Sequence, residues 1–134
     1  MTFTVHIIDD DPSVRRALWE LLESAGFNVI PYASGEAFFA DETAVSSDCI
    51  ITDIRMPGLS GFDLIERLRL QGRNIPVIVV SAYDDDHIRL RACKLGVKAF
   101  FRKPVDDSEL IDAIRRLVAT SSRAANPEDR FEKH

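Results

Sequence analysis

The sequence predicts an α/β protein, built as a doubly wound five-stranded parallel sheet with helices on both faces. Short apolar runs alternate along the chain with segments of helical periodicity, and the connections between them are short. Residues 76–80, Pro-Val-Ile-Val-Val, are almost all β-branched, as in a strand covered on both faces. A chain of 134 residues with 46% hydrophobic content suits one compact domain.

The elements follow in order from hydrophobic period and stop signals. Residues 3–8 predict a strand, and a helix follows from Pro12 to Ala25, with Asp11 as its N-cap and Gly26 as its stop. The further strands are expected at residues 27–32, 49–52, 76–80 and 99–102, and the further helices near residues 34–40, 62–72, 84–95 and 110–118.

The apolar period ends near residue 119. From Thr120 onward Ser, Arg, Ala, Asn, Pro and Glu dominate, so residues 1–119 are expected to form the domain and residues 120–134 a C-terminal tail or the start of a linker.

Composition narrows the class of function. A net charge of −5 argues against direct nucleic acid binding, which needs clustered Lys and Arg. No apolar run approaches the about 20 residues of a membrane span, and the N-terminus turns acidic too soon for a signal peptide, so we expect no membrane association and a cytoplasmic location. Cys49 and Cys93 lack the spacing of a disulfide or metal motif and are expected to be buried hydrophobes.

Charged or hydroxyl side chains that could take part in chemistry follow four of the predicted strands. Asp9 and Asp10 come after the first strand, Asp53 after the third, Ser81 after the fourth and Lys103 after the fifth. Right-handed crossovers place the carboxyl ends of parallel strands on one edge, where open α/β sheets bind ligands. We therefore expect these side chains to converge on one site.

Four segments carry a family resemblance. Ile8-Asp9-Asp10, residues 52–57 (Thr-Asp-Ile-Arg-Met-Pro), Ser81-Ala82 and Lys103-Pro104 together resemble the receiver domain of two-component response regulators, over about residues 3–119. The Arg-Met-Pro and Lys-Pro steps further resemble receivers of the nitrogen-fixation and nitrate regulator class. The resemblance implies strand order 2-1-3-4-5 in a flavodoxin-like, three-layer αβα fold. It also implies a protein that is not a dedicated enzyme and at most catalyses its own phosphoryl transfer and dephosphorylation.

The resemblance assigns roles around Asp53, which would accept a phosphoryl group from a sensor histidine kinase or a phosphotransfer protein. Mg²⁺ (or Mn²⁺) would be held by Asp10, Asp53 and the backbone carbonyl of Arg55, with Asp9 acting from the second coordination sphere. A cation is needed because two carboxylates 4 Å apart repel by about 4 kcal/mol at an effective dielectric of about 20. Lys103 would supply positive charge to the phosphoryl oxygens.

The resemblance also implies a read-out. Ser81 would bond the phosphoryl group and couple to Phe100, changing the surface of the fourth helix and fifth strand, through which a phosphorylation-induced homodimer could form. Phe100 could instead simply pack in the core. Arg55 and Tyr83 occupy positions that tune dephosphorylation, and their bulk predicts slow loss of the phosphoryl group.

Arg15, Arg16 and Trp19 lie off the apolar stripe of the first helix and are candidates for docking the phosphoryl donor. The alternative for Trp19 is partial packing against neighbouring helices.

Simpler interpretations stand beside these roles. The Asp9–Asp11 run could be a solvated turn, and convergence with Asp53 argues against this. Lys103 could be an ordinary edge lysine, and its placement before Pro104 at a strand end argues against that. Ser81 could merely end a strand, and taken alone it fits that interpretation as well as the functional one. The second acidic run, residues 84–86, begins a helix and is interpreted as capping and solubility. His6 and His87 have no partner at ligand spacing and are expected to be structural or solvated.

Two rival functions fit the sequence less well. A hydrolase of the haloacid dehalogenase type needs a carboxylate two residues after the nucleophile, where this chain has Arg55. A receiver used only as a binding module usually lacks an acidic residue or the lysine, and this chain has both.

Overall fold

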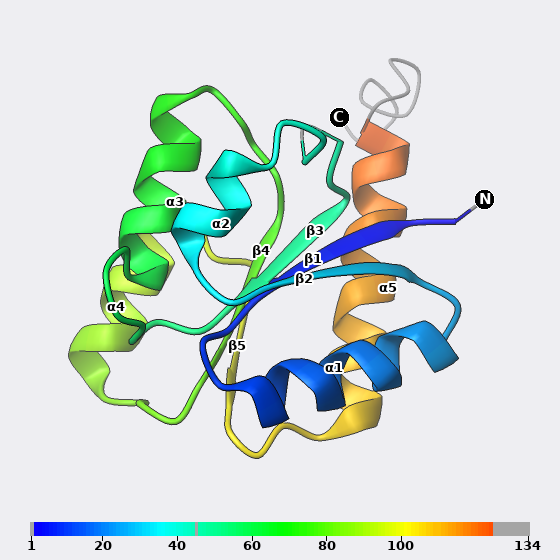
Figure 1. Cartoon of the computed structure of the whole chain (residues 1–134), viewed down its shortest axis with the longest axis horizontal. Helices are drawn as coiled ribbons and strands as arrows, with labels where there is room; N and C mark the ends of the chain where they lie inside the picture. The colour runs from blue at the N-terminus through cyan, green and yellow to red at the C-terminus, as the bar shows by residue number, and fades with distance from the viewer. Residues whose placement is uncertain (1, 45, 125–134) are drawn as a thin grey trace, which may run out of the picture.

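The computed structural model describes residues 2–44 and 46–124 and shows a three-layer arrangement (Figure 1). The sheet is parallel throughout and has the order β2-β1-β3-β4-β5, which confirms the predicted fold class and strand order. Its strands are β1 Thr4–Ile8, β2 Asn28–Tyr32, β3 Cys49–Thr52, β4 Val77–Ser81 and β5 Ala99–Arg102.

Helices cover both faces of the sheet. They are α1 Pro12–Ser24, α2 Gly35–Ala40, α3 Gly61–Leu70, α4 Asp86–Lys94 and α5 Asp107–Ala124. Figure 1 shows α1 and α5 on one side of the sheet and α2, α3 and α4 on the other. α5 continues past residue 119, so the predicted tail begins with helix; the domain boundary stays a prediction, and residues 125–134 lie outside the described residues.

Helix starts follow the capping residues in the sequence. Asp11 caps α1 as predicted, because its carboxylate accepts a hydrogen bond from the Ser13 amide at 2.9 Å. In the second acidic run Asp85 caps α4 by accepting from the Ile88 amide. Asp84 instead pairs with Arg89, so the capping interpretation holds for only part of this run.

Two hydrophobic cores flank the sheet. One packs β-strand side chains such as Ile8 and Val79 against α2, α3 and α4, and the other packs Ile7 and Val80 against α1 and α5. β3 and β4 are buried along their whole length, as expected for central strands covered on both faces. This rigid centre fixes where the carboxyl ends of the strands lie.

The two cysteines differ in burial. Cys49 on β3 is fully buried, as predicted, and burial raises the pKa of its thiol to about 12. The prediction for Cys93 is wrong, because its side chain is exposed on α4. The buried positions of α4 are Ile88 and Ala92, and the next residue along a helix turns by about 100°, onto the outer face.

His6 is a buried residue of β1. Its Nδ1 lies 2.7 Å from Ser47 Oγ, and its ring contacts Tyr32 and Phe38. Its Nε2 has no hydrogen-bond partner among the described residues, and burial lowers the pKa of the ring. The structural interpretation of His6 is confirmed.

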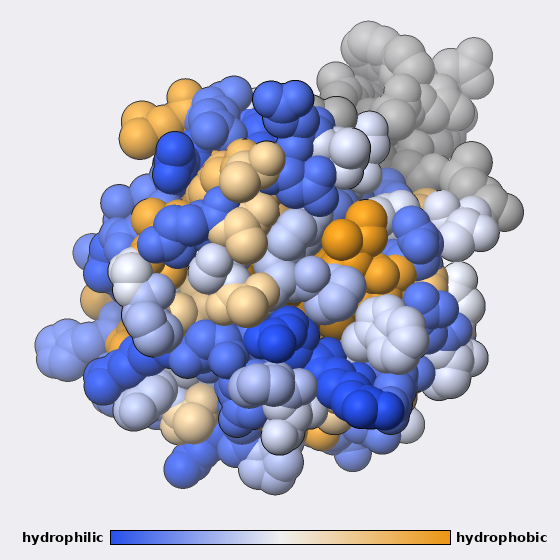
Figure 2. Space-filling model, in the orientation of Figure 1, coloured by the Kyte–Doolittle hydropathy of each residue, from blue (hydrophilic) through white to orange (hydrophobic). Residues whose placement is uncertain are grey.

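Figure 2 shows one face of the molecule as mostly hydrophilic, with apolar residues gathered in a few small areas. Within residues 2–44 and 46–124, we find no helix with the length and apolar character required to cross a membrane.

Candidate functional site

The carboxyl ends of β1, β3 and β5 bring three charged side chains into direct contact. Lys103 Nζ lies 3.0 Å from Asp9 Oδ2 and 2.9 Å from Asp53 Oδ2. Asp9 directly follows β1, Asp53 follows β3 and Lys103 follows β5, and the Lys103–Pro104 peptide bond is cis. The structure therefore joins three of the segments that the sequence predicted to converge.

Backbone amides hold the remaining carboxylate oxygens. Asp9 Oδ1 accepts a hydrogen bond from the Asp11 amide at 2.9 Å, and Asp53 Oδ1 accepts from the Ile54 amide at 2.7 Å. Asp10 is exposed, and within the described part of the chain its carboxylate has no hydrogen bond or ion pair. Asp10 is thus the carboxylate still free to take a ligand.

Burial and pairing set the charges of this cluster. Asp9 is almost fully buried, and this burial raises its pKa although the Asp11 amide and Lys103 act in the opposite direction. For Lys103, burial opposes the charge, but the hydrogen bonds with Asp53 and Asp9 outweigh it, so the pKa of the ammonium is raised. Lys103 is therefore positively charged across the physiological range.

The carboxylates are close enough to share one cation. One oxygen each from Asp9, Asp10 and Asp53 lies within 4.8 Å of the others. Hard divalent cations such as Mg²⁺ and Mn²⁺ prefer oxygen ligands of this kind. Three carboxylates beside the single ammonium of Lys103 leave a net negative charge, so the donor set fits a divalent cation.

Glycine at position 61 allows α3 to pack directly on Asp53. A Cβ atom at Gly61 would lie 2.0 Å from the main-chain oxygen of Asp53, closer than any two such atoms can come. The Gly61 amide donates to the main-chain oxygen of Ile54 at 2.8 Å. Sequence reasoning did not identify this contact.

Ser81 lies at the end of β4 and is fully buried. Its Oγ accepts a hydrogen bond from the Tyr83 amide at 3.0 Å. The Tyr83 ring stacks against Arg55, whose Cζ lies 3.8 Å from the ring centroid. The predicted dephosphorylation-tuning residues therefore touch each other, and they join the loops that follow β3 and β4.

Phe100 on β5 is partly buried against the core that contains α4. The guanidinium of Arg89 covers its ring at 4.7 Å and forms two hydrogen bonds to Asp84. The loop before α4 is thus tied to the predicted switch aromatic, a link that the sequence did not reveal.

The predicted docking residues gather on α1. Pro12, Arg15, Arg16, Trp19 and Pro31 line a shallow cavity of about 290 Å³. Trp19 is 39% exposed, so it is partly packed against the protein and partly accessible to a partner, and both interpretations stand. Arg16 pairs with Glu20 at 2.9 Å, whereas Arg15 points its Nη1 at the main-chain oxygen of Asp9, 2.7 Å away.

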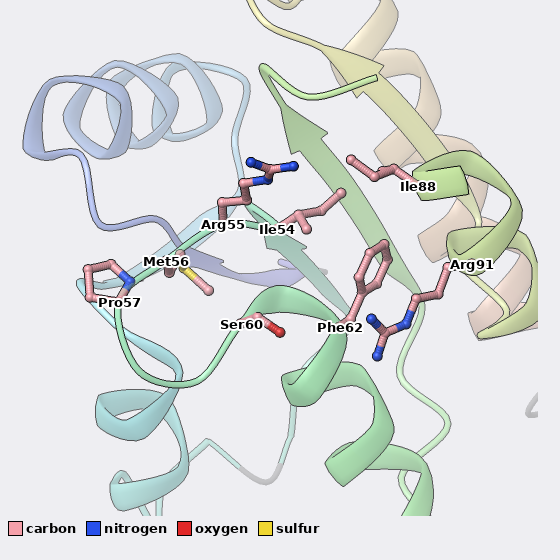
Figure 3. Close-up of a pocket in the computed structure, with 8 residues that line it drawn as sticks. All are labelled: Ile54, Arg55, Met56, Pro57, Ser60, Phe62, Ile88 and Arg91. Carbon is pink, nitrogen blue, oxygen red and sulfur yellow. The ribbon is translucent and has the colours of Figure 1, made fainter. Parts of the chain in front are cut away.

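A larger open pocket of about 570 Å³ lies beside the site, and sequence reasoning did not identify it (Figure 3). Ile54 and Arg55, which directly follow Asp53, line it from the β3–α3 loop. Arg91 lines it from α4 and is already engaged, because it pairs with Glu66 at 2.9 Å and covers the Phe62 ring.

The chain is similar to proteins of one known family. Residues 5–115 match the family model described as the response regulator receiver domain. The chain is 40% identical over 125 residues to the transcriptional regulatory protein FixJ of Azorhizobium caulinodans, covering 93% of this chain and 59% of the relative. It is also 40% identical over 131 residues to FixJ of Rhizobium meliloti, covering 95% and 64%. The chain thus spans less than two thirds of the length of these relatives.

Solved structures show the same fold. The crystal structure titled FixJ-N superposes with a TM-score of 0.81 at 38% identity, covering 89% of this chain and 95% of that chain. The chemotaxis protein CheY4 of Vibrio cholerae superposes with a TM-score of 0.80 at 24% identity, covering 87% and 99%.

Proposed function

The chain belongs to the family of response regulator receiver domains, which act in two-component signalling, and from this premise we propose that it is a switch operated by phosphorylation of Asp53. The phosphoryl donor would be a sensor histidine kinase or a phosphotransfer protein. The observation that carries the proposal is the contact of Lys103 with both Asp9 and Asp53 in one carboxylate cluster. A cytoplasmic location, expected from the sequence, goes with this role.

The transfer needs little covalent chemistry from the protein. A carboxylate oxygen of Asp53 forms a bond to phosphorus as the bond between phosphorus and the donor breaks, and the donor keeps that electron pair. The product is an acyl phosphate on Asp53. The Ile54 amide and Lys103 already orient the two carboxylate oxygens, which is the positioning that phosphoryl transfer requires.

Asp10, Asp53 and the main-chain carbonyl of Arg55 would hold Mg²⁺ or Mn²⁺, and Asp9 would act from outside the first coordination sphere. When bound, the cation would offset the negative charge that the phosphoryl group brings to the carboxylates. Lys103 contributes a second positive charge to the cluster, and its ammonium bridges Asp9 and Asp53.

Read-out would pass through Ser81 and Phe100. When the Ser81 hydroxyl turns to bond the phosphoryl group, its hydrogen bond from the Tyr83 amide breaks, and the loop before α4 loses this attachment to β4. Movement of Phe100 then displaces the Arg89 guanidinium that covers it and changes the α4/β5 surface. A phosphorylation-induced homodimer could form through this surface.

Arg55 and Tyr83 would control how long the signal lasts. Their stacked side chains place a bulky pair beside the strand end that carries Asp53, where they restrict the approach of hydrolytic water. We expect slow dephosphorylation, and the double variant Arg55→Ala, Tyr83→Ala should shorten the acyl-phosphate lifetime.

The docking role assigned to Arg15, Arg16 and Trp19 stays a prediction. Trp19→Ala should lose phosphoryl transfer from a protein donor while keeping phosphorylation by a small donor. Loss of neither would remove α1 as the docking surface.

The central experiment is incubation with Mg²⁺ and acetyl phosphate, followed by intact-protein mass spectrometry. We expect the wild-type chain to gain the mass of one phosphoryl group and Asp53→Asn to gain none. A binding module that needs no phosphorylation would show no gain in either protein. A hydrolase of the haloacid dehalogenase type is disfavoured, because it needs a carboxylate two residues after the nucleophile and this chain has Arg55 there.

The FixJ relatives are named as transcriptional regulators. We extend a transcriptional output to this protein as a proposal, with no direct contact between these 134 residues and nucleic acid.

A further inference from the structure

We infer that Arg15 is a positioning residue for Asp10, acting through the peptide unit that joins Asp9 to Asp10. The inference rests on the proposed function, since it assigns a purpose to Asp10 as a cation ligand. It separates Arg15 from the docking role that it shared with Arg16 and Trp19.

The contact that carries the inference is made to the backbone. Asp9 lies one residue beyond β1, where its amide still donates to the main-chain oxygen of Tyr32 at 3.2 Å. Its own main-chain oxygen accepts from Arg15 Nη1 at 2.7 Å. That oxygen belongs to the planar peptide unit leading into Asp10, so holding it fixes the plane from which Asp10 departs.

Asp10 needs such support more than its neighbours do. The carboxylate of Asp9 is held by the Asp11 amide and Lys103, and that of Asp53 by the Ile54 amide and Lys103. The carboxylate of Asp10 has no such partner within the described part of the chain. The backbone therefore fixes where the side chain of Asp10 starts, and the Arg15 side chain holds this backbone.

The first turn of α1 makes this support rigid. The Arg15 amide donates to the main-chain oxygen of Asp11 at 2.9 Å, and the Asp11 amide donates to the Asp9 carboxylate. Arg15 thus closes a small ring of hydrogen bonds that spans residues 9–15. Arg16 takes no part in it, because its guanidinium pairs with Glu20 on the exposed side of α1.

Charge and positioning predict effects of opposite sign when Arg15 is replaced. Removing a positive charge close to a cation site, by itself, strengthens cation binding. Removing the support of the Asp9–Asp10 peptide weakens it, and loss of such an outer contact typically costs at least about tenfold in metal affinity. The sign of the change therefore separates the two roles.

The experiment is a titration of the full chain with Mg²⁺ in the absence of any phosphoryl donor. Binding is monitored by NMR, from the signals of the backbone amides of residues 8–11. Arg15→Met removes charge and donor while keeping side-chain length, and we expect Mg²⁺ affinity to fall about tenfold. Arg15→Lys keeps a charged donor, and because Arg15 makes a single hydrogen bond to the Asp9 carbonyl, this variant should bind Mg²⁺ more tightly than Arg15→Met does. Arg15→Leu, which also removes both charge and donor, tests the same expectation should the Met variant fail to fold.

Arg115→Met is the matched control. Arg115 also directs a guanidinium at a main-chain oxygen, that of Ala25 at 3.4 Å, and is exposed on α5. Its loss removes the same charge without touching residues 9–15, so Mg²⁺ affinity should not change.

Unchanged or tighter Mg²⁺ binding in Arg15→Met, alongside normal binding by wild type, overturns the positioning role and leaves the proposed function intact. A wild-type chain that binds no Mg²⁺ overturns the proposed cation site and this inference with it.

Discussion

Replacing Lys103 by methionine should destabilise the protein at neutral pH. Methionine preserves much of the aliphatic volume but leaves Asp9 and Asp53 without the lysine ammonium that both of them contact. The side chains of Asp9, Asp53 and Lys103 are 2%, 11% and 19% exposed, so both ion pairs are largely desolvated. Breaking a buried ion pair by removing one partner costs about 3–5 kcal/mol, and the partial exposure of Lys103 favours the lower end, about 3 kcal/mol.

The pH dependence of that loss provides the sharper assay. The pKa of Asp9 is already raised by burial, and Lys103 is one of the groups that hold it down, so the substitution raises it further. Between the unfolded and folded pKa values of Asp9, the folded state binds more protons than the unfolded state, so stability falls as pH rises. Urea unfolding of the variant should therefore show a smaller deficit at pH 5 than at pH 7.5.

Lys98→Met is the control, because Lys98 is exposed and precedes β5; its effect should stay within about 0.5 kcal/mol. Saturating Mg²⁺ should restore part of the stability of Lys103→Met by supplying positive charge to the same carboxylates. A deficit below about 1 kcal/mol at pH 7.5, or one independent of pH, would refute the view that Lys103 neutralises a buried carboxylate pair.

Three further outcomes are expected. Gly61→Ala should lose more than about 2 kcal/mol in urea unfolding, because the new Cβ must displace the Asp53 carbonyl; wild-type stability would show that the loop yields freely. The ring of His6 should titrate below its ordinary pKa of 6.5 in an NMR titration; since the unfolded state then binds more protons, stability should fall below pH 6.5 by up to about 1.4 kcal/mol per pH unit. Mg²⁺ at 100 times its Kd should add about 2.7 kcal/mol of stability to wild type and none to Asp10→Ala, and equal gains would place the cation elsewhere.

The fold and the location of the site could be predicted from the sequence because both depend on regular hydrophobic periods and on the handedness of the crossovers. Alternating strand and helix periods imply a parallel sheet, and right-handed crossovers put all carboxyl ends on one edge. That reasoning was enough to bring Asp9, Asp53 and Lys103 together before any distance was known. The strand order came from the family resemblance, since hydrophobic period does not determine which strands are neighbours.

Side-chain contacts across elements could not be predicted in this way. Whether Arg15 or Arg16 reaches the β1–α1 loop depends on the rotation of α1 about its axis and on rotamers, which sequence spacing leaves open. The stack of Arg89 on Phe100 likewise depends on how α4 sits against β5. The exposure of Cys93 was missed because a cysteine next to an apolar stripe looks much like one within it.

The contrast between the two cysteines has a practical consequence. Cys49 is enclosed in β3 with a pKa of about 12, so its thiolate is scarce at neutral pH and no reagent can reach it without unfolding. Cys93 is the other cysteine of the chain, and it stands exposed on α4. These 134 residues therefore carry a single chemically addressable thiol, on the helix that phosphorylation is proposed to move. A fluorophore or spin label attached there would report the switch without any engineered residue.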